Sequence, residues 1–247
     1  MHVLVTRPAE DAEPLKSRIE ALGCKVSLAP LMEIVPNEIA PDDMDGATAL
    51  IATSGNALSV IARSLVELPL VQKLPLYVVG PGTAAAARVA GFQNIVEGAG
   101  RARDLVPLLT SKGAKIGKRP IYLRGDHLAF DLEAALAQAG VTIVPVTAYR
   151  AVAAEALPAT VIKALQTGGI DIVTLMSPRT ARIWARLVAV LSPPPQLSGV
   201  TYLCLSNRVA EALGPLAKAD KVVVPSHPNV DDMIALVKRL AAGSKAE

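Results

Sequence analysis

The chain has 247 residues, and 51% of them are hydrophobic, so it can bury one large core or two small ones. Only 3% are aromatic, and 25 Lys and Arg residues nearly balance 22 Asp and Glu residues, for a net charge of +3. These values argue against a nucleic-acid-binding surface, which needs strong positive charge or stacking aromatic rings, but they leave room for a locally positive site for an anionic ligand.

Ten short runs rich in β-branched residues predict strands. They cover residues 2–6, 25–29, 48–53, 76–80, 94–97, 120–124, 142–146, 171–176, 201–206 and 221–225. The runs are continuously apolar rather than alternating, so we expect them to be buried on both faces. This favours parallel sheets covered by helices, an α/β fold.

Amphipathic stretches between these runs predict helices. Apolar residues share one face of the segment 12–22, and Gly23 follows as a stop signal. The segment 128–139 repeats this pattern and is followed by Gly140. We expect two equivalent helices that both end at a glycine.

The strongest apolar stripe covers residues 180–191. Ser177 is expected to cap this helix, and Pro178 is expected at its first position, where no backbone N–H is needed. We expect Asp231 or Asp232 to open the last helix of the chain.

The two halves of the sequence resemble each other. Arg7 corresponds to Arg124 and Ser54 to Ser177, and the spacing between corresponding residues grows slowly along the chain. Two similar halves suggest two similar lobes, and a cleft between lobes is a usual place for a ligand.

Two proline-containing segments, 31–40 and 147–158, are the best candidates for linkers. If both cross between lobes, the middle of the chain forms one lobe and the two ends together form the other. The pattern alone does not choose this division over a single cut near residue 117.

Five turns that follow predicted strands are rich in Ser, Thr, Asn, Gly, Pro or Arg. They are residues 6–8, 53–56, 80–83, 177–180 and 206–208. Ligands of open parallel sheets bind beyond the carboxyl ends of the strands, where helix N-termini present free N–H groups. Each turn taken singly is best interpreted as a helix cap. The set of five supports a rim that binds carboxylate or phosphate at least as well.

Other motifs give weaker signals. Residues 80–85 fit a dinucleotide-binding pattern, but Glu97 is a poor ribose-binding acid because it lies in its own predicted strand. Tyr149 lies in the second linker, where its hydroxyl either faces a ligand or simply packs at a hinge, and the pattern does not decide between them. Cys24 and Cys204 read as buried fillers rather than as a disulfide.

The three histidines have no metal-ligand spacing, so no metal is expected. No apolar run has the length of a membrane helix, and charged residues occupy positions 7, 10 and 11 instead of an apolar secretion signal. We therefore expect a cytoplasmic protein without a membrane partner.

Taken in order, the motifs resemble those of the uroporphyrinogen-III synthase family over nearly all of residues 1–240. They are TRP, LAPLMEI, ATSGNA, VVGPGTAAAA, LRGD, VTAYR and SPRTARIW. The resemblance implies two flavodoxin-like domains, each a doubly wound parallel five-stranded sheet, joined by two linker segments. Domain 1 would comprise residues 1–35 and 152–247, and domain 2 residues 37–148.

The resemblance also implies a reaction. Linear hydroxymethylbilane, which carries eight carboxylates, would be cyclised to uroporphyrinogen III with loss of water and inversion of ring D. No cofactor or metal would be needed. Hand-over of substrate from hydroxymethylbilane synthase is a further expectation, and a monomer is our default expectation because the sequence is silent on oligomeric state. Without enzyme the substrate closes to the uninverted isomer, so positioning of the chain should dominate catalysis.

Candidate site residues follow from the same resemblance. Tyr149 would donate a proton to the departing hydroxyl, directly or through water, and Thr83 would assist. The substrate-binding candidates are Arg7, Thr53, Ser54, Asn56, Gly80, Gly82, Arg124, Ser177, Pro178, Arg179 and Ser206, with Arg150 as a further arginine near the linker.

One turn departs from the family pattern. The second-half turn reads LSNRVA, with Ser206 where the family has glycine and Val209 where it has threonine. A ligand contact there is therefore in doubt, although Asn207 or Arg208 could replace it. Two other functions stay open from the sequence: a non-catalytic two-lobed protein that binds a small anion, and a nucleotide-dependent transferase.

Overall fold

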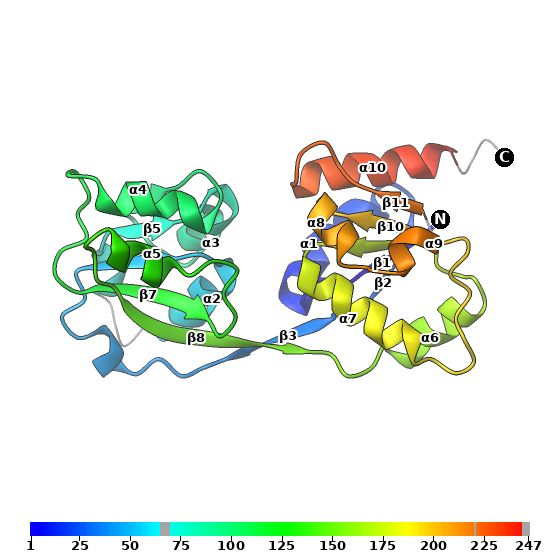
Figure 1. Ribbon diagram of the computed structural model, residues 1–247, viewed down its shortest axis with the longest axis horizontal. Helices are drawn as coiled ribbons and strands as arrows, with labels where there is room; N and C mark the ends of the chain where they lie inside the picture. Colours follow the sequence, from blue (N-terminus) through cyan, green and yellow to red (C-terminus); the bar gives the residue numbers. More distant parts are fainter. Residues whose placement is uncertain (65–69, 220, 244–247) are drawn as a thin grey trace. The chain divides into compact units, whose positions relative to one another are not determined.

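The computed structural model describes residues 1–64, 70–219 and 221–243, and the chain divides into two compact units (Figure 1). Unit 1 consists of Met1–Glu33 and Val152–Glu247, and unit 2 consists of Ile34–Ala151. Unit 1 therefore contains both ends of the sequence, while unit 2 is continuous.

Unit 1 contains a five-stranded sheet in which every neighbouring pair of strands is parallel. The order across the sheet is β11 (Lys221–Val223), β10 (Thr201–Cys204), β9 (Ile172–Leu175), β1 (His2–Val5) and β2 (Lys25–Leu28). Helices α1 (Ala9–Glu20) and α10 (Val230–Gly243) pack on one face. The other face is covered by α6 (Ala159–Gln166), α7 (Pro178–Ala189), α8 (Asn207–Glu211) and α9 (Leu216–Ala219).

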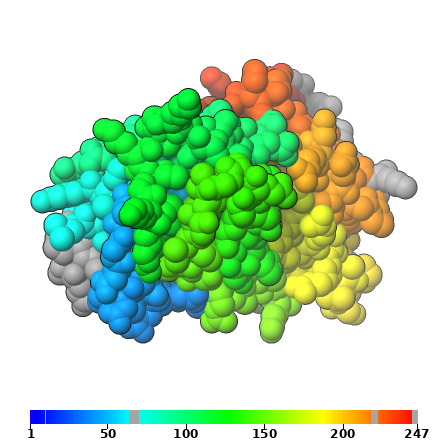
Figure 2. All heavy atoms as spheres, turned by 60° about the vertical axis from the view of Figure 1, so that its left-hand side comes forward, coloured from blue at the N-terminus to red at the C-terminus, as the bar shows by residue number. Residues whose placement is uncertain are grey.

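Unit 2 contains a six-stranded sheet. The order across it is β3 (Met32–Pro36), β8 (Val144–Ala153), β7 (Pro120–Gly125), β4 (Ala49–Ala52), β5 (Leu76–Val78) and β6 (Ile95–Glu97). Helices α2 (Gly55–Ser64) and α3 (Pro81–Val89) cover one face, and α4 (Leu105–Thr110) and α5 (Leu132–Gln138) cover the other. Figure 2 shows the green part of the chain, which includes α5, over much of the visible surface of unit 2.

The two sheets share one spatial arrangement. The order β11-β10-β9-β1-β2 in unit 1 corresponds to β6-β5-β4-β7-β8 in unit 2, with each half of the sequence supplying strands to both sheets. Numbered along the chain, unit 1 has the 2-1-3-4-5 order of flavodoxin-like folds. Unit 2 has the same layout, but its last two strands take the places of the first two.

All ten predicted strands are present, and the predicted α/β class with two doubly wound sheets is correct. The second sheet has six strands rather than five because β3 was not predicted. Its run MEIVP is half-exposed and ends in proline, both typical of an edge strand and neither typical of a buried one.

Strand β3 runs antiparallel to β8. Asn37 N donates to Ala148 O over 2.8 Å, and Ala154 N donates to Leu31 O over 3.0 Å. Both predicted linker segments thus contain extended backbone that pairs along the sheet edge, and the chain passes from one unit to the other within these two strands.

The glycine stops were predicted correctly, but one helix start was not. Gly23 and Gly140 adopt φ values of +80° and +79°, the left-handed conformation of a C-terminal stop. The second helix begins at Leu132 rather than near Leu128, because the Asp131 carboxylate caps it by accepting from Ala134 N over 2.9 Å. Leu128 is left exposed outside the helix.

The last helix also starts differently from the expectation. Helix α10 begins at Val230, and the Asn229 side chain caps it by accepting from Asp232 N over 2.8 Å. Asp231 and Asp232 lie in the first turn, where their charges still complement the helix dipole.

Both cysteines are buried free thiols, as predicted. Cys24 packs under α1 and Cys204 under α7, on opposite faces of the same sheet. Burial raises the pKa of Cys204 to about 12, so its thiol stays protonated and unreactive at neutral pH. Within the described residues, no cluster of His, Cys, Asp and Glu could hold a metal, and no helix is long and apolar enough to cross a membrane.

His2 ties three segments together at the amino end of the unit 1 sheet. Burial lowers the pKa of His2 below its usual 6.5, and nearby Lys25 acts in the same direction, against the hydrogen bond to Gly169 O and the charge of Asp171. The ring is therefore neutral at physiological pH. Its Nδ1 donates to Gly169 O over 2.7 Å, and its Nε2 accepts from Ser27 Oγ over 2.8 Å.

This lowered pKa predicts a pH-dependent stability. The unfolded chain takes up the His2 proton at a higher pH than the folded chain, so the stability contributed by neutral His2 is full above 6.5 and is lost as the pH falls below it. Denaturant unfolding at pH 7.5 and 5.5 should show a smaller pH dependence for His2→Gln than for wild type. The exposed His127 is the control, and His127→Gln should keep the wild-type dependence. Equal dependence in His2→Gln and wild type would refute the prediction.

Candidate functional site

The predicted turns gather at one edge of each sheet, because parallel strands place all their carboxyl ends on the same side. In unit 1, Val5 and Leu203 are both in register with Thr174. In unit 2, Leu123 and Val78 are both in register with Ala52. We call residues 6–8, 177–180 and 206–208 the unit 1 rim. The unit 2 rim comprises residues 53–56, 80–83 and 124–126 together with Tyr149.

Two buried threonines below the unit 1 rim form hydrogen bonds between neighbouring strands. Thr6 Oγ1 donates to Thr174 O over 2.5 Å, and Thr174 Oγ1 donates to Leu4 O over 3.3 Å. These bonds join the ends of β1 and β9, the two central strands between which the connections change direction. In open α/β sheets this switch point is where ligands bind.

The corresponding arginines Arg7 and Arg124 each have a carboxylate partner on the helix that follows. Arg7 Nη2 donates to Asp11 Oδ2 over 2.9 Å, and Arg124 Nη1 lies 2.9 Å from Glu133 Oε1. Each arginine side chain is only about a quarter exposed, at 25% and 26%. A ligand carboxylate must therefore use the remaining guanidinium N–H groups or displace the internal partner.

Arg124 retains an unused donor. Its Nε is buried and has no hydrogen-bond partner within the described part of the chain. A buried unsatisfied donor costs roughly 1–3 kcal/mol, and a ligand oxygen or a water molecule that accepted from Nε would recover this cost.

Ser54 and Ser177, which correspond in the two halves, both cap helices. Ser177 Oγ accepts from Thr180 N over 3.1 Å, and Thr180 Oγ1 accepts from Ser177 N over the same distance. Ser54 Oγ accepts from Asn56 N over 3.2 Å. The cap interpretation of these two turns is thus confirmed, with Pro178 and then Arg179 in the first turn of α7.

The glycine turn of unit 2 is built by close backbone approach. A Cβ on Gly80 would lie 2.9 Å from Gly100 Cα, and Gly100 N already donates to Val79 O. Gly82, by contrast, is exposed, with no atom within 4 Å of where its Cβ would lie. Gly80 is therefore required by packing, whereas Gly82 is not.

Thr83 and its counterpart Val209 occupy equivalent buried positions in the first turns of α3 and α8, at 8% and 2% exposure. A valine has the shape of threonine without the hydroxyl, so the second half keeps the packing and loses the polar group. Ser206 precedes α8 without a side-chain cap bond, and Asn207 and Arg208 are exposed beside it.

Tyr149 lies over Gly125. A Cβ on Gly125 would come within 2.7 Å of Tyr149 Cζ and 2.9 Å of its hydroxyl oxygen. The register between β7 and β8 shifts between Arg124 and Gly125, which places Tyr149 opposite Gly125. Within the described residues the Tyr149 hydroxyl has no hydrogen-bond partner, so packing alone holds the ring and its O–H stays available. Arg150, the next residue, is exposed.

A second tyrosine was missed by sequence reasoning. Tyr122 in β7 is buried, and its hydroxyl lies 3.0 Å from Thr53 Oγ1 in the unit 2 rim. Burial raises the pKa of Tyr122, so the phenol stays neutral. No local pattern joins these residues, because they are separated by 69 positions in the sequence and meet only through strand pairing.

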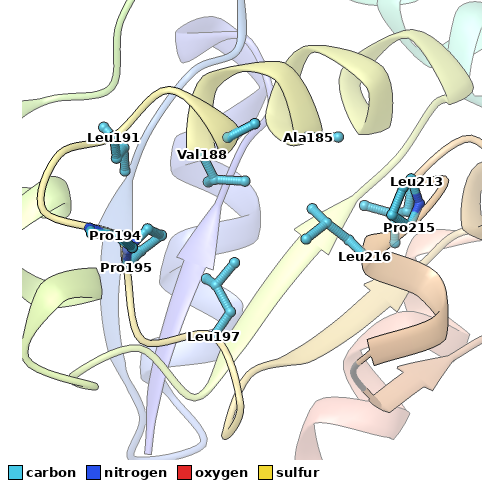
Figure 3. Close-up of a pocket in the computed structure, with 10 residues that line it drawn as sticks. Ala185, Val188, Leu191, Pro194, Pro195, Leu197, Leu213, Pro215 and Leu216 are labelled. Atoms are coloured by element: carbon cyan, nitrogen blue, oxygen red, sulfur yellow. The ribbon is translucent and has the colours of Figure 1, made fainter.

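A separate pocket in unit 1 has a different character. It has a volume of about 430 Å³, and the 10 residues that line it are all apolar. They come from α7, the loop after it, the α8–α9 connection and the start of α9. Figure 3 shows Val188, Leu197 and Leu216 around it. It contains none of the predicted site residues.

Comparisons with known proteins agree on one family. A family model described as uroporphyrinogen-III synthase HemD matches residues 13–235. A solved uroporphyrinogen-III synthetase from Helicobacter pylori is 19% identical, with 97% of this chain and 100% of that chain covered and a TM-score of 0.68. A mutant uroporphyrinogen III synthase from the thermophilic bacterium Thermus thermophilus is 20% identical, with 98% and 100% covered and a TM-score of 0.58. No curated protein matches the chain.

The glycine turn gives a prediction about stability. Gly80→Ala should lower the free energy of unfolding by about 1–3 kcal/mol, because the new Cβ meets backbone that cannot move aside. Gly82→Ala, two residues away in helix α3, should cause no loss and gain up to about 1 kcal/mol from the reduced freedom of the unfolded chain. Denaturant unfolding of the two variants measures both effects, and equal losses would contradict the packing argument.

Proposed function

The chain belongs to the uroporphyrinogen-III synthase family, and we propose that it cyclises hydroxymethylbilane to uroporphyrinogen III with loss of water and inversion of ring D. The observation that carries this proposal is the family match over residues 13–235. The protein is thus an enzyme of tetrapyrrole biosynthesis, and the proposal adds the reaction class, a cyclising hydro-lyase. The non-catalytic anion-binding alternative is not favoured by the family match.

The rims suit a polyanionic substrate. Helix N-termini and capped turns present backbone N–H groups at the carboxyl ends of the strands, and these groups bind carboxylates without a large basic surface. This agrees with a net charge of only +3. We assign the substrate carboxylates to the rim turns at Thr53–Asn56, Gly80–Thr83 and Ser177–Arg179, with Arg7 and Arg124 as side-chain partners and Ser206 as a weaker contact.

Tyr149 is the proposed proton donor. Its O–H would protonate the ring A hydroxyl, directly or through water, as the carbon–oxygen bond breaks and the pyrrole nitrogen donates its lone pair to form an azafulvene cation. Ring D then attacks through its substituted carbon, and the resulting spiro intermediate fragments and recloses inverted. Loss of a proton from the product restores the neutral phenol. Thr83 is assigned an assisting role beside this step.

Positioning carries most of the catalysis in this proposal. The enzyme must favour inverted closure over the spontaneous uninverted closure. A 100-fold preference needs only about 2.7 kcal/mol of differential barrier lowering. Holding a flexible chain in one reactive geometry is sufficient for an effect of this size.

The proposal also covers the oligomeric state, the location and the partners of the protein. We propose a monomer in the cytoplasm that receives its unstable substrate by hand-over from hydroxymethylbilane synthase, with no nucleic-acid or membrane partner. Direct hand-over would limit the spontaneous closure that competes with the enzyme.

The reaction can be tested by product analysis. Purified protein supplied with hydroxymethylbilane should give mostly the type III isomer, separated from type I by chromatography after oxidation. Heat-denatured protein is the control and should give type I only. Type I as the sole product of the native protein would refute the proposed function.

The role of Tyr149 can be tested at two positions. Tyr149→Phe should lower kcat about 10- to 100-fold by removing the donor, with little change in product affinity. Gly125→Ala should lower kcat in the same direction, because its Cβ would displace the Tyr149 ring from a distance of 2.7 Å.

Gly113→Ala is the matched control, since a Cβ there meets no atom within 4 Å and Gly113 lies in the same unit. It should leave kcat unchanged. Normal turnover in Tyr149→Phe would remove Tyr149 from the mechanism, and normal turnover in Gly125→Ala would show that the ring position does not matter.

A further inference from the structure

We propose that Tyr122 is a positioning residue that fixes the Thr53 hydroxyl as a hydrogen-bond donor to a carboxylate of the substrate. The proposal rests on the proposed function, in which Thr53 is one of the rim contacts. It adds a residue of β7 that does not itself reach the ligand.

The geometry follows from strand register. Tyr122 in β7 is directly opposite Ile51 in the neighbouring strand β4. Side chains two residues apart in a strand lie on the same face, so Thr53 follows Ile51 on the face that carries Tyr122. The phenol reaches along that face toward the carboxyl end of the sheet, where the two hydroxyl oxygens are 3.0 Å apart.

The direction of the hydrogen bond follows from burial. Tyr122 is 1% exposed, and within the described residues its hydroxyl contacts no acceptor other than Thr53 Oγ1. If Thr53 donated to Tyr122, the phenolic proton would be left without an acceptor inside the core, which is unfavourable. Tyr122 therefore donates and Thr53 accepts.

This direction determines what Thr53 offers to a ligand. A threonine hydroxyl has one proton, and that proton stays free when the oxygen accepts from Tyr122. Thr53 is half-buried at the rim, so its proton can point to an incoming group. Only an acceptor satisfies it, and a carboxylate oxygen makes the stronger, charge-assisted bond. A donor that also accepts a hydrogen bond is strengthened further.

The chain contains a matched control on the same face of the same sheet. Tyr77 in β5 is opposite Ile51 from the other side, is buried to 3% exposure, and belongs to the same apolar cluster as Tyr122. Its hydroxyl accepts from Lys115 N over 2.8 Å, in the segment that precedes β7, and so makes its bond away from the rim. The two tyrosines differ mainly in the position of their hydrogen bond: Tyr122 makes it at the carboxyl end of the sheet and Tyr77 at the amino end.

The test compares four variants by steady-state kinetics on hydroxymethylbilane, with isomer analysis of the product. Tyr122→Phe should raise KM about five-fold and leave kcat within about two-fold, because the contact is made in both ground and transition states. Tyr77→Phe should lower the thermal stability about as much as Tyr122→Phe does, because each removes one buried hydrogen bond, but it should leave KM unchanged. Thr53→Val should raise KM at least as much as Tyr122→Phe, and the double variant Thr53→Val/Tyr122→Phe should match Thr53→Val alone.

Each other outcome has a defined meaning. Type I product from wild type refutes the proposed function itself. Type III product together with an unchanged KM in Thr53→Val refutes the Thr53 contact and the inference with it. A raised KM in Thr53→Val but not in Tyr122→Phe, an equal rise in Tyr77→Phe, or additive effects in the double variant refutes the positioning role alone.

Discussion

Parallel strand pairing is the constraint on which the rest of this structure depends. With β3 as the exception, the strands of each sheet run in one direction, so all their carboxyl ends and the N-termini of the following helices meet at one edge. Helix N-termini carry unpaired N–H groups and partial positive charge. An edge of this kind can hold an anionic ligand through backbone N–H groups at Ser, Thr and Gly residues, which suits the carboxylate-rich substrate proposed for this nearly neutral chain.

The duplication explains why two such edges exist and why they differ. Corresponding strands occupy corresponding places in the two sheets, and Arg7 and Arg124 retain the same kind of carboxylate partner. The glycine turn diverged instead. Gly98 and Gly100 pack against the turn at Gly80 and exclude a side chain there, whereas the corresponding loop of unit 1 contains no such glycine pair and Ser206 is tolerated. The chemistry of the two edges could therefore change independently without a change of fold.

Local sequence patterns predict most of the fold but only part of the site. Buried strands and glycine stops were predictable, because apolar runs and left-handed turns depend on a few neighbouring residues. Strand β3 was missed because a half-exposed edge strand lacks that apolar signal, and Leu128 was misplaced in a helix because Asp131 begins the helix later. The Tyr122–Thr53 contact and the packing of Tyr149 on Gly125 arise from strand pairing over long sequence separations, which no local pattern contains.

The two ends of the sheets differ in how their polar groups are satisfied. At the amino ends, both ring nitrogens of His2 are hydrogen-bonded, and Thr48 Oγ1 both donates to Ile116 O and accepts from Arg119 N. At the carboxyl end of unit 2, Arg124 Nε is buried and has no partner among the described residues. A buried donor without an acceptor destabilises the folded chain. A ligand that supplied the missing acceptor, as in the proposed substrate complex, would recover that cost, so the same group that weakens the free protein would favour the bound one.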